Sequence, residues 1–343
     1  MDFSPSELQR ELAQGTRELL TDRCPPAVVR ATWEKPDETA ASTVGSASSA
    51  SALWAALTEL GLPGALVAED AGGLGLTVSD LLPALVETGR AAVPAPIAET
   101  ALVAVPLLAA AGCADLLAGI ASGEVVVTAA PQDELVPWAS VATHALVLGT
   151  GEARLVERAE LGGEPVAAVD GSRPLTRTAP GVGSALDVEV GQVALARARA
   201  ALGAAAQLVG LGERQLAITV DYVRTRQQFG VPIGSFQAIK HHLADALLGI
   251  RFAEPPVRAA GLALDAGAGS DTDAVRPVAL AKALASDAAD AVSRIAIQCH
   301  GAIGYTDEYD LQLYAKRTWA LAAAWGTAGE HRAVYGDALG LPA

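Results

Sequence analysis

The 343-residue sequence is poor in cysteine, in basic residues, in aromatic residues and in long apolar runs. Its three cysteines, Cys24, Cys113 and Cys299, lie far apart without a CxxC pair, which excludes a disulfide framework and a zinc site and fits a reducing cytosol. Lys and Arg number 24 against 39 Asp and Glu, giving a formal charge of −15. Because no basic stripe is present, we expect neither nucleic-acid binding nor docking on an anionic membrane surface.

Nothing in the sequence predicts membrane insertion or export. The N-terminal segment MDFSPSELQRELAQ lacks the basic start and apolar core of a signal peptide. The best candidate for a membrane span, residues 101–114, is too short and contains Pro106. We therefore expect a cytoplasmic protein. Hydrophobic residues make up 51% of the chain and aromatic residues only 4%, an Ala-rich composition that favours helices.

The spacing of apolar residues divides the chain into three parts, which we predict as domains. Residues 1–122 have helical periodicity, except for 21–51, which are rich in Pro, Ser and Gly and are predicted as a long loop. Residues 123–191 carry short β-type runs and predict a small β domain. Residues 192–343 predict a helical bundle. The expected fold class is mainly α with a small β domain.

More detailed predictions concern individual elements. A helix is expected over 5–20, with Ser4 or Ser6 as a possible N-cap. The β-type runs lie at 125–128, 145–148 and 166–169, and Leu155-Val156 and Val188 are candidates for further strands. The expected bundle helices are 193–226, 236–266, 273–299 and 309–325. Because proline removes a helical hydrogen bond, Pro255-Pro256 should kink or split the second of these helices.

Two segments carry chemical information. Residues 221–245, DYVRTRQQFGVPIGSFQAIKHHLAD, predict a helix end, a Gly–Pro turn and a new helix near Ser235. Residues 298–316, QCHGAIGYTDEYDLQLYAK, run from a helix end through a glycine-containing turn into another helix. A turn of small residues lets a ligand approach the backbone, where exposed N–H groups can bind a phosphate.

Together, RxxFGxPIGxFQxxKHxLAD and, some sixty residues later, QxxGxxGYTxEY closely resemble the acyl-CoA dehydrogenase family of flavoproteins. The N-terminal runs LGLPG, EDAGGLG and ETGRA agree with this resemblance. It implies a helical N-terminal domain, a β-barrel-like middle domain, shortened here, and a C-terminal four-helix bundle. It also implies FAD as cofactor and oxidation of the Cα–Cβ bond of an acyl-CoA substrate. The implied electron acceptor is an electron-transferring flavoprotein.

The resemblance assigns residues to the cofactor. Arg226 matches an arginine that reaches the FAD pyrophosphate of the neighbouring subunit, a task that suits a guanidinium fork. Phe229 resembles the aromatic residue that packs on that flavin, and Gln237 lies at the family's FxQ position near the cofactor. The residues that match the segment holding the adenosine-diphosphate portion are Gln298, Gly301, Ala302 and Gly304, with Ala302 in place of a second glycine. No metal site is expected, and His241 and His242 are predicted to be bundle residues.

The catalytic base of the family is missing. Most relatives carry it as the Glu of a YEGT segment, which here reads AWGT, so that Trp325 takes its place. Some relatives place it on the first bundle helix, where a gapless count gives Ala200. Neither side chain can accept a proton. Glu330, one helical turn beyond the AWGT segment, is the remaining candidate for a displaced base; its other interpretation is a residue on a solvated helix face.

The flavin-holding TEPxxGSD-like stretch of the middle domain is also largely lost, at residues 128–134. The residues kept are those that would serve a flavin seated mainly in a partner. In some actinobacterial members of the family, unequal homologous subunits form an α2β2 assembly with one FAD at each unlike interface, and the smaller subunit lacks the base. The chain resembles that subunit, whose larger homologous partner would supply the Glu and the thioester pocket. Two alternatives stay open: a self-sufficient homo-oligomeric dehydrogenase with a displaced carboxylate, and a non-catalytic scaffold or acyl-thioester-binding relative.

Overall fold

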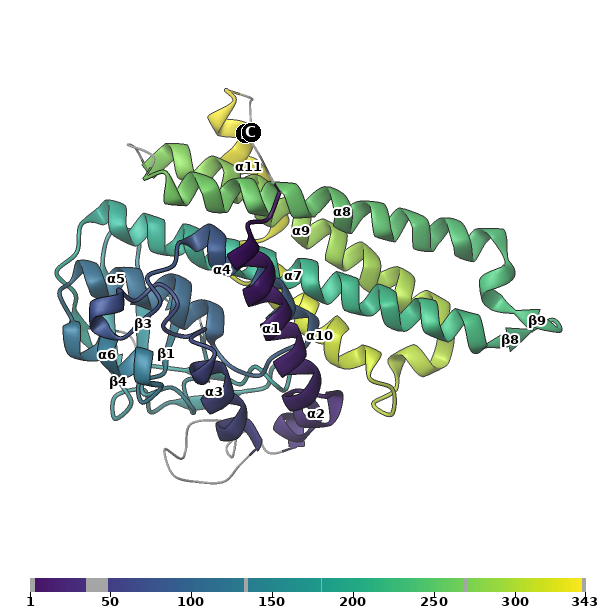
Figure 1. Ribbon diagram of the computed structural model, residues 1–343, viewed down its shortest axis with the longest axis horizontal. Helices are drawn as coiled ribbons and strands as arrows, with labels where there is room; N and C mark the ends of the chain where they lie inside the picture. Colours follow the sequence, from purple (N-terminus) through teal and green to yellow (C-terminus); the bar gives the residue numbers. More distant parts are fainter. Residues whose placement is uncertain (1–3, 35–48, 133–134, 180, 268–270, 341–343) are drawn as a thin grey trace.

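The structure is a computed structural model, and it describes residues 4–34, 49–132, 135–179, 181–267 and 271–340 (Figure 1). Helices dominate it, and the strands are few and short, so the predicted fold class is confirmed. Among the described residues, no helix is long and apolar enough to cross a membrane. All three cysteines are free thiols.

Helices make up nearly all of the regular structure in the first 122 residues. The first helix begins at Ser6, whose hydroxyl accepts the Gln9 N–H while the Gln9 side chain accepts the Ser6 N–H, a capping box. The segment Glu99–Ala104, η3, is a turn of π-helix that runs directly into α5. The α-helices of this part are α1 Glu7–Arg23, α2 Pro26–Glu34, α3 Ser49–Glu59, α4 Val78–Arg90, α5 Val105–Ala110 and α6 Ala114–Ser122, and a 3-10 turn, η2, spans Glu69–Ala71.

Helix α2 corrects the predicted long loop over 21–51. Pro26 is its first residue, where the missing N–H leaves no helical hydrogen bond unmade, so the proline starts the helix instead of preventing it. Val29 is fully buried, which anchors the helix to the core. The later part of the predicted loop, 35–48, lies outside the described residues.

The middle region folds into two small sheets. One has the strand order β1-β3-β4-β7, with β1 and β3 parallel and the other pairs antiparallel; the other is antiparallel with the order β2-β6-β5. The expected strand at 166–169 ends at Val166, Val188 lies in no strand, and β6 was not predicted because three residues show no periodicity. The bounds are β1 Val127–Pro131, β2 Val136–Pro137, β3 His144–Leu148, β4 Ala153–Glu157, β5 Glu164–Val166, β6 Leu175–Arg177 and β7 Ser184–Ala185.

The last third is a bundle of long helices, and the four expected segments are all helical. Helix α8 stays one continuous helix through Pro255 and Pro256, so the expected split is wrong. The carbonyls that the prolines leave free belong to Arg251 and Phe252, which are exposed and therefore accessible to water. The helices are α7 Val190–Thr225, α8 Gln237–Asp265, α9 Asp271–His300, α10 Leu311–Ala323 and α11 Ala328–Ala338, and the short elements are β8 Gln227–Gln228, β9 Val231–Pro232, η4 Ile233–Ser235 and η5 Gly301–Tyr305.

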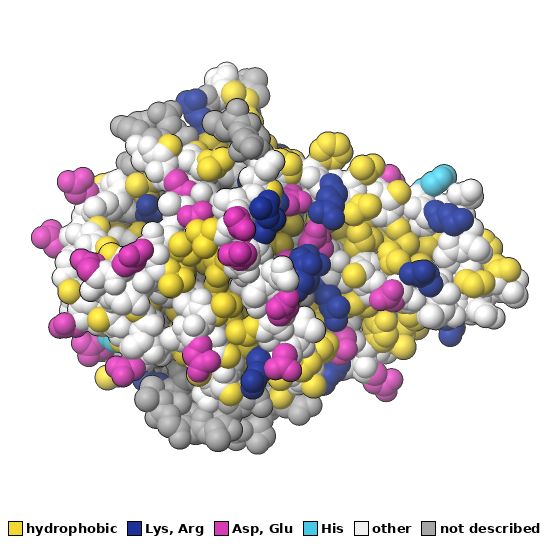
Figure 2. Space-filling model, in the orientation of Figure 1, with side chains coloured by type: hydrophobic (Ala, Val, Ile, Leu, Met, Phe, Trp, Pro, Cys, Tyr) yellow, Lys and Arg dark blue, Asp and Glu magenta, His cyan; other side chains and the backbone are white. Residues whose placement is uncertain are grey.

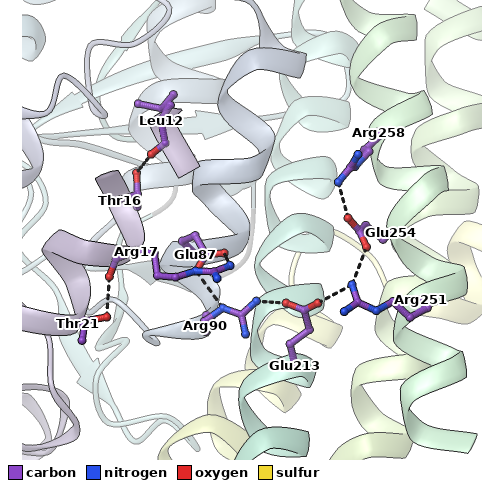
Figure 3. A network of polar contacts seen from close by, with 10 residues as sticks. All are labelled: Leu12, Thr16, Arg17, Thr21, Glu87, Arg90, Glu213, Arg251, Glu254 and Arg258. Atoms are coloured by element: carbon purple, nitrogen blue, oxygen red, sulfur yellow. Dashed lines mark hydrogen bonds and ion pairs between the residues drawn. The ribbon is translucent and has the colours of Figure 1, made fainter. Parts of the chain in front are cut away.

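The close packing of the helices explains why small residues occupy their contacts. Helices α4 and α7 approach so closely that a Cβ on Gly210 would lie 1.8 Å from the Val86 carbonyl oxygen. A row of ion pairs connects the helices α1, α4, α7 and α8 (Figure 3). In it, nearly buried Glu87 binds arginines of α1 and α4, and Glu213 binds arginines of α4 and α8. The N-terminal helices are thereby fixed to the bundle.

Candidate functional site

The hairpin after α7 is the first unusual feature. Arg226 caps the helix through its backbone, and β8 and β9 are joined by Phe229 and Gly230, whose φ angles are 53° and 81°. Two positive φ values are typical of a type I′ turn, which a bulky residue such as phenylalanine adopts only with strain. Phe229 is also 92% exposed, with only an edge contact to Phe236. A strained and exposed aromatic side chain indicates a binding surface.

The glycine turn after α9 is the second unusual feature. Gly301 has a φ of 64°, and no heavy atom lies within 4 Å of the place where its Cβ would be. Its backbone is therefore open to a ligand. Gly304 is buried, and a Cβ there would lie 3.2 Å from the Ile297 carbonyl oxygen. Gln298 and Ala302 are both exposed.

Aromatic stacking brings these two segments together. The rings of Tyr222, near the end of α7, and His300, at the end of α9, stack with their centroids 4.2 Å apart, and the Tyr309 ring lies 4.9 Å from His300. The buried His300 ring donates from Nδ1 to the Ala296 carbonyl oxygen at 2.7 Å, and burial lowers its pKa. We call residues 222–237 and 298–305 the bundle tip. Predicted cofactor residues from both motifs meet there.

Ser235 does not cap α8 as the sequence predicted. It lies in η4, its hydroxyl donates to the Pro232 carbonyl oxygen at 2.7 Å, and the N-cap of α8 is Phe236. Gln237 is then the first residue of the helix and is exposed. The helix therefore starts one residue later than the sequence predicted, after the 3-10 turn Ile233–Ser235.

A cleft of about 440 Å³ lies at the other predicted site, between β1 and α10. Ala129, Ala130 and Pro131 form one wall, and Trp319 and Trp325 lie on the other. The two segments that the sequence analysis matched to the family's active site therefore line one cavity. The Thr128 hydroxyl is buried and donates to the Pro137 carbonyl oxygen at 2.8 Å, so it is committed to the protein. Asp133 and Glu134 lie outside the described residues.

The turn that carries Trp325 is supported by a lysine that the sequence analysis missed. Lys282 of α9 is fully buried, and its Nζ lies 3.0 Å from both the Ala322 and the Gly326 carbonyl oxygens and 3.1 Å from Ser286 Oγ. Burial lowers the pKa of Lys282 to about 7. The available signal was a single lysine within the apolar run ALAKALA. Trp325 itself has a φ of 60°.

Asp170 is the only carboxylate among the described residues that line the cleft, and it is already engaged. It forms an ion pair with Nε of Arg317, which is 2% exposed, and accepts hydrogen bonds from the Ser172 N–H and hydroxyl at 3.0 and 2.7 Å. Arg317 also donates to the Val93 carbonyl oxygen. A carboxylate that neutralises a buried guanidinium is poorly suited to take a proton from a substrate.

The other two positions considered for a base offer none. Glu330 is exposed, and its Oε2 accepts the Thr327 N–H at 2.7 Å and the Thr327 hydroxyl at 2.8 Å, which lowers its pKa. These bonds complete the capping box of α11, and Glu330 is not among the residues that line the cleft. Ala200 is buried in the cluster that joins α7 to the first sheet.

Comparison with known families decides the identity of the fold. The acyl-CoA dehydrogenase N-terminal domain matches residues 6–124, and the acyl-CoA dehydrogenase C-terminal domain matches residues 188–340. The chain belongs to the acyl-CoA dehydrogenase family. It is an oxidoreductase family, its members are flavoproteins, and FAD is the cofactor.

Individual relatives agree with this membership. Acyl-CoA dehydrogenase IpdE2 of Mycobacterium tuberculosis is 33% identical over 92% of this chain and 92% of its own, and IpdE2 of Mycolicibacterium smegmatis is 34% identical over 80% and 83%. The Tcur3481-Tcur3483 steroid ACAD G363A variant aligns with a TM-score of 0.85 at 25% identity, over 97% of both chains. The ChsE4-ChsE5 complex from Mycobacterium tuberculosis shares the fold, with a TM-score of 0.83 at 22% identity over 100% of both chains.

The bundle tip fits the nucleotide part of FAD. Its exposed groups are a guanidinium, an aromatic ring, two side-chain amides and an open glycine backbone, contributed by Arg226, Phe229, Gln237, Gln298 and Gly301. Guanidinium and backbone N–H groups suit phosphate oxygens, and an aromatic face suits a planar heterocycle. The cleft presents the Trp325 indole, and the carboxylate among its described lining residues, Asp170, is paired with Arg317.

Figure 1 shows β8 and β9 of the tip at one end of α7 and the sheet that contains β1 toward the other end. Ala200 packs with β1 residues, while Tyr222 belongs to the tip. The helix between these two residues spans about 33 Å. The tip and the cleft share no described residue.

Proposed function

We propose that the chain is the accessory subunit of a heteromeric acyl-CoA dehydrogenase, in which a larger homologous subunit supplies the catalytic Glu and the thioester pocket. One observation carries this proposal. The residues that match the cofactor motifs belong to the tip, none of them lines the chain's own cleft, and that cleft offers no uncommitted carboxylate among the described residues. Such a chain can hold a cofactor for a neighbour, and the described residues of its cleft include no free carboxylate to remove the α-proton.

The proposed roles follow from side-chain chemistry. Arg226 binds the FAD pyrophosphate, and Phe229 packs against the cofactor seated in the partner. Gln237 contacts the cofactor beside it, while Gln298 and the turn Gly301 to Gly304 bind the adenosine-diphosphate portion through side-chain and backbone groups. FAD, when bound, accepts the β-hydrogen of the acyl-CoA as a hydride. The proposed substrate is an acyl-CoA, and the proposed acceptor is an electron-transferring flavoprotein.

Exposed apolar residues on the bundle support a contact with another subunit. Hydrophobic side chains gather on the bundle half of the visible face (Figure 2). On α8, Leu248 and Phe252 are 53% and 73% exposed, and Leu247 lies beside them. An exposed apolar patch is typical of an interface. The names of two aligned structures, Tcur3481-Tcur3483 and ChsE4-ChsE5, each include two proteins, which supports the proposal that this chain has an unlike partner subunit.

The decisive experiment measures flavin in the purified chain, in a purified larger homologous subunit, and in their mixture. We expect one FAD per unlike pair in the mixture and little in this chain alone. Full FAD binding and acyl-CoA oxidation by this chain alone would instead establish the self-sufficient homo-oligomeric enzyme with another base.

Two variants test the role of the tip within the mixture. Arg226→Ala is expected to lower the flavin content, because the phosphate loses its guanidinium. Arg294→Ala is the matched control, since Arg294 is an exposed arginine of α9 paired only with Asp290 in the described structure. Equal flavin content in both variants and the wild type would favour the non-catalytic scaffold.

A further inference from the structure

Helix α2 contacts segments that belong to both partial sites. It lies against α10, and Arg30 and Trp33 are its contact residues. Arg30 reaches the loop 306–310, which directly follows the glycine turn of the tip. Trp33 packs against Gly171, where a Cβ would lie 2.8 Å from the indole Cγ. Gly171 is the neighbour of Asp170, a lining residue of the cleft.

Arg30 holds the loop at two points. One terminal nitrogen donates to the Asp307 carbonyl oxygen, and the other lies 2.6 Å from Asp310 Oδ1. The two ion-paired side chains are only 30% and 45% exposed. Asp310 is the N-cap residue of α10, yet its side chain makes no capping hydrogen bond. Its carboxylate therefore serves Arg30 instead of the helix.

A second contact fixes the same loop. The Lys316 ammonium lies 4.5 Å from the centroid of the Trp33 ring and 3.5 Å from Asp307 Oδ1. The loop is thereby held between α2 and α10 by one arginine, one lysine and one indole. Sequence separation hides the arrangement, because Arg30 and Asp310 are 280 residues apart.

We propose that Arg30 is a positioning residue for cofactor binding: by fixing loop 306–310, it holds the turn Gly301–Tyr305 in the conformation that presents its backbone to the nucleotide. The inference rests on the proposed function for the identity of the ligand. Arg30 does not itself touch the cofactor. Without it, the turn keeps its sequence but loses its support on one side, so part of the binding energy must be used to order it.

FAD titration of the complex with the larger subunit, followed by flavin fluorescence, tests this role. Removing one partly exposed ion pair and one charge-assisted hydrogen bond predicts that Arg30→Ala weakens FAD binding about three- to tenfold. Arg30→Lys should recover part of the loss, because it keeps a cation near Asp310. The control Arg23→Ala removes an exposed arginine of α1, paired with the sequence neighbour Asp22, and should stay within about twofold of the wild type.

Hydrogen exchange of the cofactor-free chain separates positioning from general stability. Arg30→Ala should speed amide exchange within 301–310 and leave the centres of α7 and α9 unchanged. Unchanged FAD affinity in Arg30→Ala, or an equal loss of protection throughout the bundle, would overturn the inference. If Arg226→Ala leaves FAD binding intact while Arg30→Ala still loosens 301–310, the proposed function fails and the positioning of the turn stands.

Discussion

The buried lysine beneath the Trp325 turn gives a quantitative prediction. Lys282 Nζ donates to the Ala322 and Gly326 carbonyl oxygens and to Ser286 Oγ, and no carboxylate bonds to it in the described structure. Burial lowers the pKa of Lys282 from 10.5 to about 7. Between these values the unfolded chain binds one proton more than the folded chain, so the free energy of unfolding rises with pH across this window.

The substitution Lys282→Met removes this dependence while keeping much of the side-chain volume. From about pH 7.5 to about pH 9.5, the free energy of unfolding of the wild type should increase by about 2.5 kcal/mol more than that of the variant. Urea denaturation of both proteins at the two pH values measures the difference, in which the contributions of other titrating groups cancel. Parallel pH dependences would show that Lys282 stays protonated in the folded chain and refute the reasoning.

Three further substitutions have defined outcomes. Glu330→Gln should lower the free energy of unfolding, measured by thermal melting, by no more than about 1 kcal/mol, because it weakens one exposed capping box. It should leave the turnover of the assembled enzyme intact. Lost turnover without lost stability would make Glu330 a candidate base again. Arg317→Met should lower the free energy of unfolding, measured by urea denaturation, by about 3–5 kcal/mol, because Asp170 is left buried without its cation. Adding Asp170→Leu should recover part of this loss, and additive losses in the double variant would contradict the pairing. Gly210→Ala should cost at least about 2 kcal/mol by the same assay, since the methyl group would overlap the Val86 carbonyl; a neutral effect would show that α4 can move away.

Local patterns were sufficient for most of the helical framework. The expected bundle helices agree with α7 to α10 to within a few residues, because apolar spacing repeats many times over 13 to 36 residues. Short elements were less predictable. Helix α2 begins with Pro26 and Ala27, a pattern that predicts a loop, and only the tertiary structure shows that Val29 is buried. Three-residue strands such as β6 are too short to show a repeating pattern of apolar residues. The bounds of the three domains remain predictions.

The candidate site was only partly accessible to sequence reasoning. The family motifs pointed to Arg226 and to the Gln298–Gly304 turn, and the loss of the base was visible as Trp325. That the two motifs form one tip follows from the stacking of Tyr222 on His300, and the tertiary structure alone shows that no residue of this tip lines the chain's own cleft.

The sequence by itself determined the helical content, the family and the chemical identity of the cofactor-facing groups, because helix periodicity, capping and motif spacing depend on residues close together in the chain. Only the tertiary structure decided which of these groups can act together. Asp170 is bound to Arg317 across 147 residues, and the loop behind the glycine turn is fixed by Arg30 across 280. Pairings of this kind depend on how helices pack, and no local pattern records that.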